Sequence, residues 1–321
     1  MAKIYVTCRV FADEIERLRD AGHDVTMRAE EGPISRDELL HHIGDVDALI
    51  CLLSDRINAQ VIAAAPNLRI IANLGVGYDN IDVPAARARG IVVTNTPGAL
   101  TETTADLTFA LLLSAARRIM EADEYVRAGK FLGWELLQEH LGQDVFGKTL
   151  GIVGMGRIGT AVARRGHFGF GMSVLYHNRH RNTEAETELG ARQVSFKELL
   201  ERSDFVCVHA PLTEETRHLF DKDAFRLMKD SAILVNVARG PIVDEAALVW
   251  ALESGEIAGA GLDVYEREPK ISPGLLKLKE RVVLAPHIGS ATVETRRELA
   301  RIAVDNVLFV LAGRSPLTPV T

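Results

Sequence analysis

Short runs of valine, isoleucine and leucine alternate with helical patterns along most of the chain. In the first part, the strand-like runs are residues 3–10, 24–29, 47–53, 69–75 and 91–96. The stretches between them, such as 12–22 and 35–44, carry apolar residues at three- and four-residue intervals and begin near serine or aspartate caps. This rhythm predicts parallel βα units whose helices cover the faces of a sheet.

A longer helical pattern follows over residues 101–130. It opens with threonine and glutamate in positions suited to capping and closes near Gly129, so we expect one connecting helix. A second alternating series then has strand-like runs at 149–153, 173–178, 205–210, 232–238, 259–264 and 282–287. The last helical pattern, 292–313, has no sheet of its own and is expected to pack back on the first domain.

The predicted fold class is therefore α/β, with two doubly wound parallel-sheet (Rossmann-like) domains and a cleft between them. One domain is expected to be discontinuous and to comprise residues 1–98 and 288–321. The other is expected to comprise residues 99–287.

Charge and composition argue against several classes of partner, although a local basic site remains open. The 321 residues carry a net charge of −7 and a pI near 5.8, which argues against nucleic acid, since phosphate-backbone binding needs a concentrated basic face. Cys8, Cys51 and Cys207 each lie in an apolar run, so we expect buried structural thiols and no metal site. No signal-peptide h-region or membrane-spanning apolar stretch is present, and we expect a cytoplasmic protein with no membrane partner.

A glycine-rich loop, GMGRIG at 154–159, lies directly between the strand-like run 149–153 and a helical run. Gly154 permits a tight turn, Gly156 lets the backbone approach a pyrophosphate, and Gly159 lets helix and strand pack closely. The amides at the helix start would then bind the anion, with Met155, Arg157 and Ile158 in the same loop. This context predicts a dinucleotide site.

The residues after the next strand decide which dinucleotide is favoured. A carboxylate that binds the ribose hydroxyls is expected roughly 20 residues after the loop. The chain has Asn178, Arg179, His180 and Arg181 there instead. Guanidinium groups bind a 2′-phosphate through charge-assisted hydrogen bonds, so NADPH is favoured over NADH. The alternative is an ordinary solvated charge cluster.

Three polar residues follow strands of the second series: Arg239, Glu268 and His287. The carboxyl edge of an open α/β sheet is where ligands bind. Reduction of a keto acid needs a cation for the carboxylate, a proton donor for the developing alkoxide, and a partner that keeps the donor protonated. Arg, His and Glu can supply these functions, although isolated residues after strands are often structural.

The chain resembles the D-isomer-specific 2-hydroxyacid dehydrogenase family. The matching motifs span nearly the whole chain; they are LGVGYDNID at 74–82, the glycine loop, HAPLTEETRHL at 209–219, NVARGPIVDEAAL at 236–248, GLDVYEREP at 261–269 and PHIGSAT at 286–292. The resemblance implies that the discontinuous domain is a flavodoxin-like substrate domain and that residues 99–287 form an NADP-binding Rossmann domain.

The resemblance also implies roles for individual residues. Arg239 would bind and polarise the keto acid, His287 would donate the proton, and Glu268 would hydrogen-bond the imidazole and stabilise its protonated form. The backbone amides of Val76 and Gly77 would bind the substrate carboxylate, although the glycines there could simply turn the chain. Residues near Leu53, from Leu52 to Ser54, would set the size of the substrate side chain.

Further cofactor contacts are implied by the same resemblance. Asp263 would hold the nicotinamide carboxamide, with a strand-end cap as the alternative, and Thr104 would touch the cofactor or cap its helix. The remaining positions implied at the cofactor are His209, Pro211, Thr216, Val237, Ala238, His287 and Gly289, with Thr213 on the same stretch as Thr216.

Within the family, the chain looks most like glyoxylate/hydroxypyruvate reductases and 2-ketogluconate reductases. An NADPH-preferring reductase of glyoxylate and hydroxypyruvate is the first hypothesis, ahead of 2-ketogluconate reduction, of another D-2-hydroxyacid dehydrogenase using NADH, and of a phosphoglycerate dehydrogenase. A noncatalytic dinucleotide sensor, like the corepressors that share this fold, is the hypothesis from another class. By resemblance we expect a homodimer, with the helix from Glu102 and the segment through Trp134 at its interface; Trp134 could equally be a core aromatic.

Overall fold

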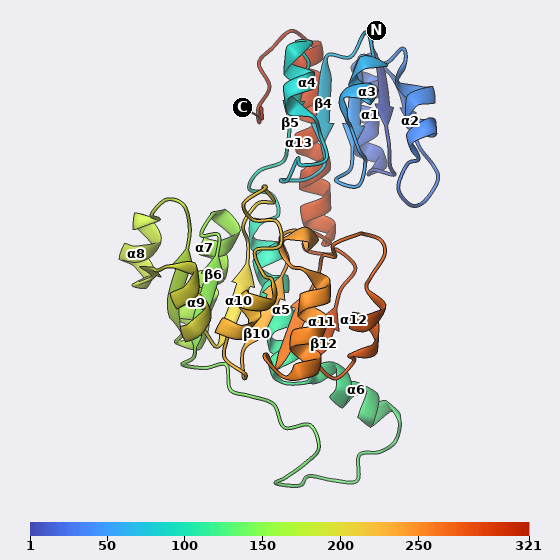
Figure 1. Cartoon of the computed structure of the whole chain (residues 1–321). Helices are drawn as coiled ribbons and strands as arrows, with labels where there is room; N and C mark the ends of the chain where they lie inside the picture. Colours follow the sequence, from blue (N-terminus) through green and yellow to red (C-terminus); the bar gives the residue numbers. More distant parts are fainter. Residues whose placement is uncertain (321) are drawn as a thin grey trace. The chain divides into compact units, whose positions relative to one another are not determined.

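A parallel five-stranded sheet forms the core of the first of two units into which the chain divides. The computed structural model describes residues 1–320 (Figure 1). The first unit comprises residues 1–100 and the chain from 290 onward, and the second comprises residues 101–289. The two parallel sheets confirm the predicted α/β class and the two-domain Rossmann-like fold.

The first sheet has the strand order β2-β1-β3-β4-β5, with every neighbouring pair parallel. This is the order of flavodoxin-like sheets. The elements of the unit are β1 (Lys3–Val6), α1 (Ala12–Asp20), β2 (Asp24–Met27), α2 (Arg36–Ile43), β3 (Ala48–Cys51), α3 (Ala59–Ala63), β4 (Ile70–Asn73), α4 (Val83–Ala88), β5 (Val92–Thr94) and α13 (Val293–Leu311).

The second sheet has seven strands in the order β12-β11-β10-β9-β6-β7-β8, again all parallel. Its elements are α5 (Thr101–Ala116), α6 (Ile119–Arg127), β6 (Thr149–Val153), α7 (Arg157–Arg164), the π-helix η1 (Arg165–Gly169), β7 (Ser173–His177), α8 (Thr183–Leu189), β8 (Arg192–Gln193), α9 (Phe196–Arg202), β9 (Phe205–Val208), α10 (Lys222–Leu227), β10 (Ile233–Asn236), the 3₁₀ helix η2 (Gly240–Ile242), α11 (Glu245–Ser254), β11 (Gly259–Leu262), α12 (Pro273–Lys277) and β12 (Val282–Leu284).

The central strands are buried on both faces, as the unbroken apolar runs predict for parallel sheets covered by helices. All residues of β3, β4, β9, β10 and β11 are buried. Side-chain caps begin several of the covering helices: Ser35 caps α2, Asn58 caps α3 and Asp244 caps α11. No helix within residues 1–320 is long and apolar enough to cross a membrane.

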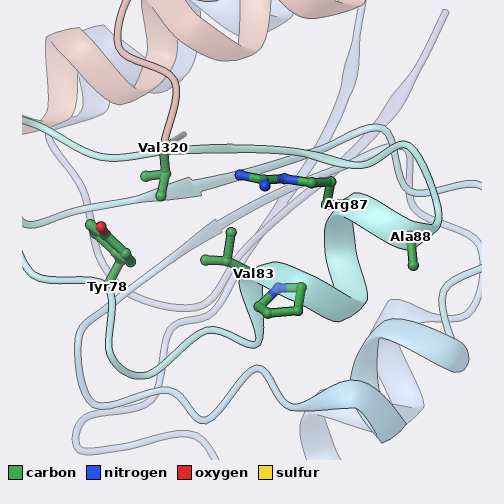
Figure 2. A pocket seen from close by; sticks show the side chains of 6 residues that line it. Tyr78, Val83, Arg87, Ala88 and Val320 are labelled. Atoms are coloured by element: carbon green, nitrogen blue, oxygen red, sulfur yellow. The ribbon is translucent and has the colours of Figure 1, made fainter. Parts of the chain in front are cut away.

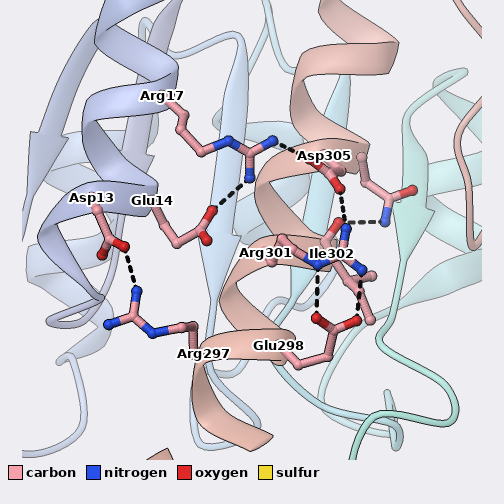
Figure 3. Close-up of polar contacts among 9 residues, drawn as sticks. Asp13, Glu14, Arg17, Arg297, Glu298, Arg301, Ile302 and Asp305 are labelled. Atoms are coloured by element: carbon pink, nitrogen blue, oxygen red, sulfur yellow. Dashed lines mark hydrogen bonds and ion pairs between the residues drawn. The ribbon is translucent and has the colours of Figure 1, made fainter. Parts of the chain in front are cut away.

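The C-terminal helix α13 belongs to the first unit, where it packs against α1, β3 and β4. Figure 3 shows the polar contacts that join α13 to α1. Arg297 pairs with Asp13, and Arg17 bridges Glu14 of its own helix to Asp305 of α13. The prediction that the last helix returns to the sheet of the first part is therefore confirmed.

The prediction of one helix over 101–130 is wrong, because the structure has two helices, α5 and α6. Arg118 lies between them with a φ of 51°, a left-handed conformation that a continuous right-handed helix does not contain. Contacts distant in sequence hold the break. The Gln143 amide donates to the Ala116 carbonyl at 2.9 Å, and Arg118 Nη1 donates to the Glu139 carbonyl at 2.9 Å.

Smaller differences concern strand lengths and one cysteine. The strand expected over residues 3–10 ends at Val6, so Cys8 lies beyond it and is only half-buried. Cys51 and Cys207 are buried in β3 and β9, as predicted. Burial raises the pKa of Cys207 to about 12, which keeps its thiol protonated and inert at neutral pH. The two-residue strand β8 was not predicted, because its residues Arg192 and Gln193 are polar.

Candidate active site

The predicted site residues of the second unit follow successive strands of one parallel sheet. The glycine loop follows β6, Asn178 follows β7, and His209 follows β9. Arg239, Glu268 and His287 come after β10, β11 and β12 respectively. Since the strands are all parallel, these segments leave the sheet at the same edge, on both sides of the point where the strand order reverses at β6. The structure therefore places them where open α/β sheets bind ligands.

His287 and Glu268 of this group are hydrogen-bonded to each other. His287 Nδ1 lies 2.8 Å from Glu268 Oε2, and the Tyr265 amide donates to Glu268 Oε1 at 3.0 Å. Burial would raise the pKa of Glu268, but the hydrogen bond and charge of His287, the Tyr265 amide and the charge of Arg239 bring the pKa below its ordinary value. The carboxylate is thus ionised at neutral pH and holds the imidazole through Nδ1.

Arg239 lies on a short, fixed loop between β10 and η2. Asn236 Nδ2 donates to the Arg239 carbonyl at 3.0 Å, and Asn236 Oδ1 accepts the Ala238 amide at 3.0 Å. Arg239 Nη1 donates to the carbonyl of Ala238 at 2.8 Å. The buried Asn236 therefore fixes the backbone from which the guanidinium projects.

Gly240 brings this loop against the segment that carries Glu268. A Cβ at Gly240 would lie 1.9 Å from both the carbonyl carbon and oxygen of Tyr265. Only glycine permits this approach, and Tyr265 is also the residue whose amide binds the Glu268 carboxylate. Gly240 was not among the predicted site residues, although it forms part of the NVARGP motif.

Asp263 fixes the backbone around His287. The Asp263 carbonyl accepts the His287 amide at 2.9 Å, and its two carboxylate oxygens accept the amides of Ile288 at 2.7 Å and Gly289 at 2.8 Å. His287 itself has a φ of 54°, which is unfavourable for a residue with a Cβ and is held by these bonds. Burial raises the pKa of Asp263, and the two amides oppose that rise. The cap that we considered as the alternative for Asp263 is present.

Thr104 lies beside the same backbone and is buried in α5. Its hydroxyl donates to the Gly289 carbonyl at 3.1 Å. A Cβ at Gly289 would lie 3.3 Å from Asp263 Oδ2 and 3.4 Å from the Thr104 side chain. Thr104, Asp263 and Gly289, predicted from separate motifs, are therefore in contact.

The glycine loop has the geometry expected of a dinucleotide-binding turn. Gly154 has a φ of 100°, and a Cβ there would lie 2.5 Å from the Ala210 amide nitrogen. A Cβ at Gly159 would lie 2.2 Å from the Gly154 carbonyl oxygen. Gly156 is exposed and precedes α7, whose first amides point out of the helix start. Met155 is buried beneath the loop, whereas Arg157 is exposed and Ile158 is half-buried.

Asn182 supports the loop and was missed by the sequence analysis. Its Nδ2 donates to the Met155 carbonyl at 3.0 Å and to Thr160 Oγ1 at 3.2 Å, while its Oδ1 caps α8. The only sequence signal was its place at the end of the basic stretch, before a helical run.

The two arginines of the basic segment after β7, residues 178–181, differ in their contacts. Arg181 pairs with Glu186, which also accepts the Tyr176 hydroxyl at 2.7 Å. Arg179 is exposed. The pKa of Glu215 is lowered mainly by a hydrogen bond from Thr213, then by a backbone hydrogen bond, and to a smaller extent by the charge of Arg179. Asn178 donates to the His180 carbonyl at 2.9 Å. Arg181 thus has a carboxylate partner on the following helix, α8.

The loop after β9 holds its own shape. Thr216 Oγ1 donates to the Pro211 carbonyl at 2.7 Å, and the Thr213 amide donates back to Thr216 Oγ1 at 2.8 Å. His209 Nε2 is buried and has no hydrogen-bond partner within residues 1–320. Burial lowers the pKa of His209 to about 3, so its ring is neutral at physiological pH.

The remaining predicted residues belong to the first unit. Leu53 packs over Gly75, where a Cβ would lie 2.6 Å from the leucine Cδ2. Val76 and Gly77 lie in the loop after β4 and are half-buried. Figure 2 shows a pocket of the same unit, lined by Tyr78, Val83, Pro84, Arg87, Ala88 and Val320. None of the residues predicted to bind substrate lines this pocket.

A run of exposed apolar side chains follows α6 in the second unit. Phe131, Leu132, Trp134, Leu136 and Leu137 are each more than half exposed, and Trp134 is 79% exposed. The segment runs as an extended loop between α6 and β6 (Figure 1). Trp134 is therefore not a core aromatic of the single chain, which removes that alternative.

The chain is similar to known proteins of one family. The family model for the NAD-binding domain of D-isomer specific 2-hydroxyacid dehydrogenases matches residues 109–289. A glyoxylate reductase of Korarchaeum cryptofilum is 51% identical over 98% of this chain and 94% of its own length. A glyoxylate reductase of Thermococcus kodakarensis is also 51% identical, over 98% of this chain and 95% of its own length.

Solved structures extend the likeness to three dimensions. The TT0316 protein of Thermus thermophilus is 45% identical with a TM-score of 0.93, covering 99% of this chain and 100% of its own. An NADPH-dependent glyoxylate/hydroxypyruvate reductase of Sinorhizobium meliloti, in complex with NADP and malonate, is 37% identical with a TM-score of 0.86, covering 100% of this chain and 97% of its own. The chain therefore belongs to the D-isomer-specific 2-hydroxyacid dehydrogenase family of NAD(P)-dependent oxidoreductases.

Proposed function

We propose that the protein is an NADPH-preferring reductase that converts glyoxylate and hydroxypyruvate to the corresponding 2-hydroxy acids. The observation that carries this proposal is the 2.8 Å pair of His287 and Glu268 at the sheet edge that also bears Arg239 and the glycine loop. The glyoxylate reductases that are about half identical over nearly the full chain support the choice of substrate.

The residues present fit a dinucleotide. The left-handed turn at Gly154 and the close packing of Gly159 bring the exposed Gly156 to the start of α7, where unpaired amides suit a pyrophosphate. When bound, the nicotinamide cofactor supplies the hydride. Thr104, Asp263 and Gly289 would border its nicotinamide end, and Val237 and Ala238, after β10, would complete that side. The loop from His209 through Pro211 to Thr216 would cover its adenosine end.

Arg239, His287 and Glu268 would carry out the remaining chemistry. The guanidinium of Arg239 binds a carboxylate through paired hydrogen bonds and polarises the neighbouring carbonyl. With Nδ1 held by Glu268, the Nε2 of His287 donates a proton to the carbonyl oxygen as negative charge develops there. In the oxidation direction the neutral ring accepts that proton.

The preference for NADPH rests on the residues after β7. Asn178 replaces the carboxylate that would repel a 2′-phosphate, and Arg179 is exposed beside it. Arg181 would have to share its charge with Glu186. The name of the Sinorhizobium reductase as NADPH-dependent agrees with this assignment.

The other assignments are also proposals. The unit of residues 101–289 would bind the cofactor, and the first unit would contribute Leu53, Val76 and Gly77 to substrate binding. The exposed apolar run at 131–137 would be covered in a homodimer. A cytoplasmic location stays a prediction.

Initial rates of glyoxylate, hydroxypyruvate, 2-ketogluconate and pyruvate reduction, each with NADPH and NADH, test the proposal. We expect the highest kcat/KM for glyoxylate or hydroxypyruvate with NADPH. A maximum with 2-ketogluconate, or with NADH, would select the competing hypothesis for substrate or cofactor. If no small 2-keto acid is reduced with either cofactor, the protein is a noncatalytic dinucleotide sensor.

A further inference from the structure

Three consecutive peptide carbonyls in the loop after β4 accept hydrogen bonds from the end of β4 and from the segment after β5. The Gly75 carbonyl accepts the Thr96 amide at 3.0 Å, and the Val76 carbonyl accepts Asn95 Nδ2 at 2.7 Å. The Gly77 carbonyl accepts Asn73 Nδ2 at 2.7 Å. Two asparagine side chains thus hold the loop by its acceptors.

Because a peptide group is planar, fixing its carbonyl also fixes the direction of its amide N–H. The only cis peptide bond within residues 1–320 is at Pro269, so each peptide of the loop is trans. In a trans peptide the N–H points opposite to the C=O. With the three carbonyls turned toward their donors, the amides of Val76, Gly77 and Tyr78 point the other way. Within residues 1–320, none of these amides donates a hydrogen bond.

Asn73 and Asn95 are themselves held in place. Asn73 is fully buried at the end of β4, and its Oδ1 accepts Asn80 Nδ2 at 3.5 Å. The same Asn80 amino group donates to the Leu52 and Asp55 carbonyls, each at 3.0 Å. The network therefore also supports the loop that contains Leu53.

The backbone of Asn95 has separate support. Its carbonyl accepts the Thr318 hydroxyl at 2.6 Å, and its amide donates to the Thr318 carbonyl at 3.3 Å. Removal of the Asn95 side chain would therefore leave its backbone anchored while it frees the Val76 carbonyl.

We infer that Asn73 and Asn95 are positioning residues that preorganise the loop 75–78 as a carboxylate-binding site, with the Tyr78 amide as a third donor beside those of Val76 and Gly77. Neither side chain touches the anion; each acts through the carbonyl that it binds. Successive backbone amides that are left without a partner are the kind of donor set that binds anions. This inference rests on the proposed function, because the carboxylate concerned is that of the 2-keto acid.

Asn95→Ala and the isosteric Asn95→Asp test the inference. Either change removes the donor to the Val76 carbonyl. Part of the free energy of substrate binding must then be used to order the loop amides, which weakens binding. We expect KM for the keto acid to rise about tenfold, the size of one lost hydrogen bond, while kcat stays within about threefold. The inhibition constant of oxalate, a nonreactive small dicarboxylate, should rise in parallel, and NADPH binding measured by fluorescence should stay unchanged.

Asn58→Ala is the matched control, because it removes a carboxamide of the same unit that caps α3. It should lower the melting temperature without raising KM. The inference fails if both Asn95 variants keep KM and the oxalate constant within twofold of wild type, if kcat falls while KM is unchanged, or if Asn58→Ala raises KM equally. Should Asn95→Ala not fold, Asn95→Asp, which keeps the side-chain volume, decides.

Failure of the proposed function gives a different result. Wild-type protein would then turn over no keto acid, and oxalate binding in the presence of NADPH, followed by thermal shift, would compare the same variants. A tenfold weaker oxalate affinity in the Asn95 variants alone would still support the positioning role. Equal affinities in wild type and variants would overturn it.

Discussion

Nδ1 of His287 lies 2.8 Å from Oε2 of Glu268, whose other oxygen accepts the Tyr265 amide at 3.0 Å. Both oxygens of the carboxylate are therefore engaged, and the imidazole is held through Nδ1. The left-handed backbone at His287 is fixed independently by the Asp263 carbonyl and carboxylate. Orientation of the ring and orientation of its backbone thus depend on different residues, which makes their contributions separable by substitution.

Glu268→Gln should lower turnover. Glutamine keeps the size of the side chain but replaces the carboxylate that holds Nδ1 of His287 with a weaker, uncharged acceptor, so the ring is positioned less well to donate its proton. We expect kcat/KM for the keto acid to fall by about tenfold to a hundredfold. Initial rates of wild type and variant under the same conditions check this.

The matched control is Glu266→Gln, a neighbouring carboxylate 3.4 Å from His218 rather than His287. Its kcat/KM should stay within about threefold of wild type. A Glu268→Gln variant with the wild-type kcat/KM would show that the contact with Glu268 does not position the ring.

Arg179→Ala should weaken NADPH more than NADH. Arg179 is exposed beside Asn178, so a 2′-phosphate there would gain a charge-assisted hydrogen bond that NADH cannot form. We expect KM for NADPH to rise about tenfold and KM for NADH to change less than twofold. Arg181→Ala, whose guanidinium already pairs with Glu186, should have the smaller effect. Equal weakening of both cofactors by Arg179→Ala would count against a 2′-phosphate site.

The fold followed from the sequence because local patterns carried it. Valine- and isoleucine-rich runs buried on both faces predicted the strands of both sheets, except β8, whose Arg192 and Gln193 give no apolar signal. The prediction of a single helix over 101–130 was wrong for the opposite reason. Its periodicity continues through Arg118, and the break depends on contacts with residues near 139–143 that no local pattern encodes.

The residues of the candidate site also differ in whether a local motif predicts them. Gly154, Arg239 and His287 could be predicted, because each stands at a strand end within a recognisable motif. Asn182 and Gly240 could not, since their importance lies in what they touch: the Met155 carbonyl for Asn182 and the Tyr265 carbonyl for Gly240. Contacts from a side chain to a distant backbone group have no period along the chain.

Gly240→Ala should disrupt both folding and activity. The added methyl would overlap the Tyr265 carbonyl group, which is backbone and cannot swing aside, so the Arg239 loop and the Glu268 segment must separate. We expect a loss of about 3 kcal/mol or more in stability and at least a hundredfold lower kcat/KM. Thermal denaturation and initial rates measure the two effects.

Gly169→Ala provides the comparison within the same unit. Nothing lies within 4 Å of a Cβ at Gly169, and its φ is compatible with alanine. Its stability should stay within about 1 kcal/mol of wild type. Comparable losses in both variants would mean that the Gly240 contact does not govern the site.

Trp134→Asp should dissociate the proposed homodimer. Trp134 is 79% exposed among other apolar side chains, and a buried charge at an interface core costs several kilocalories per mole. Light scattering should show a dimer for wild type at micromolar concentration and a monomer for the variant. Leu276→Asp, at a position 52% exposed on α12, should leave the dimer intact. A monomeric wild type would refute the interface.

His209 should make the second unit sensitive to acid. Burial lowers the pKa of His209 from its ordinary value of 6.5, which applies to the unfolded chain, to about 3 in the folded protein. The unfolded chain therefore binds the proton more readily. Stability from the neutral ring is therefore present above pH 6.5 and is lost as the pH falls toward 3, by up to ~1.4 kcal/mol per pH unit. The His209→Gln side chain cannot titrate, so the unfolding free energy of this variant should fall by roughly 1 kcal/mol less than that of wild type between pH 7 and pH 5.5.

Urea denaturation at the two pH values measures this difference, with His180→Gln, at an exposed position, as the control. Wild type and His209→Gln losing the same stability over that interval would show that His209 is protonated in the folded chain, and its buried Nε2 would then need a partner beyond those in residues 1–320.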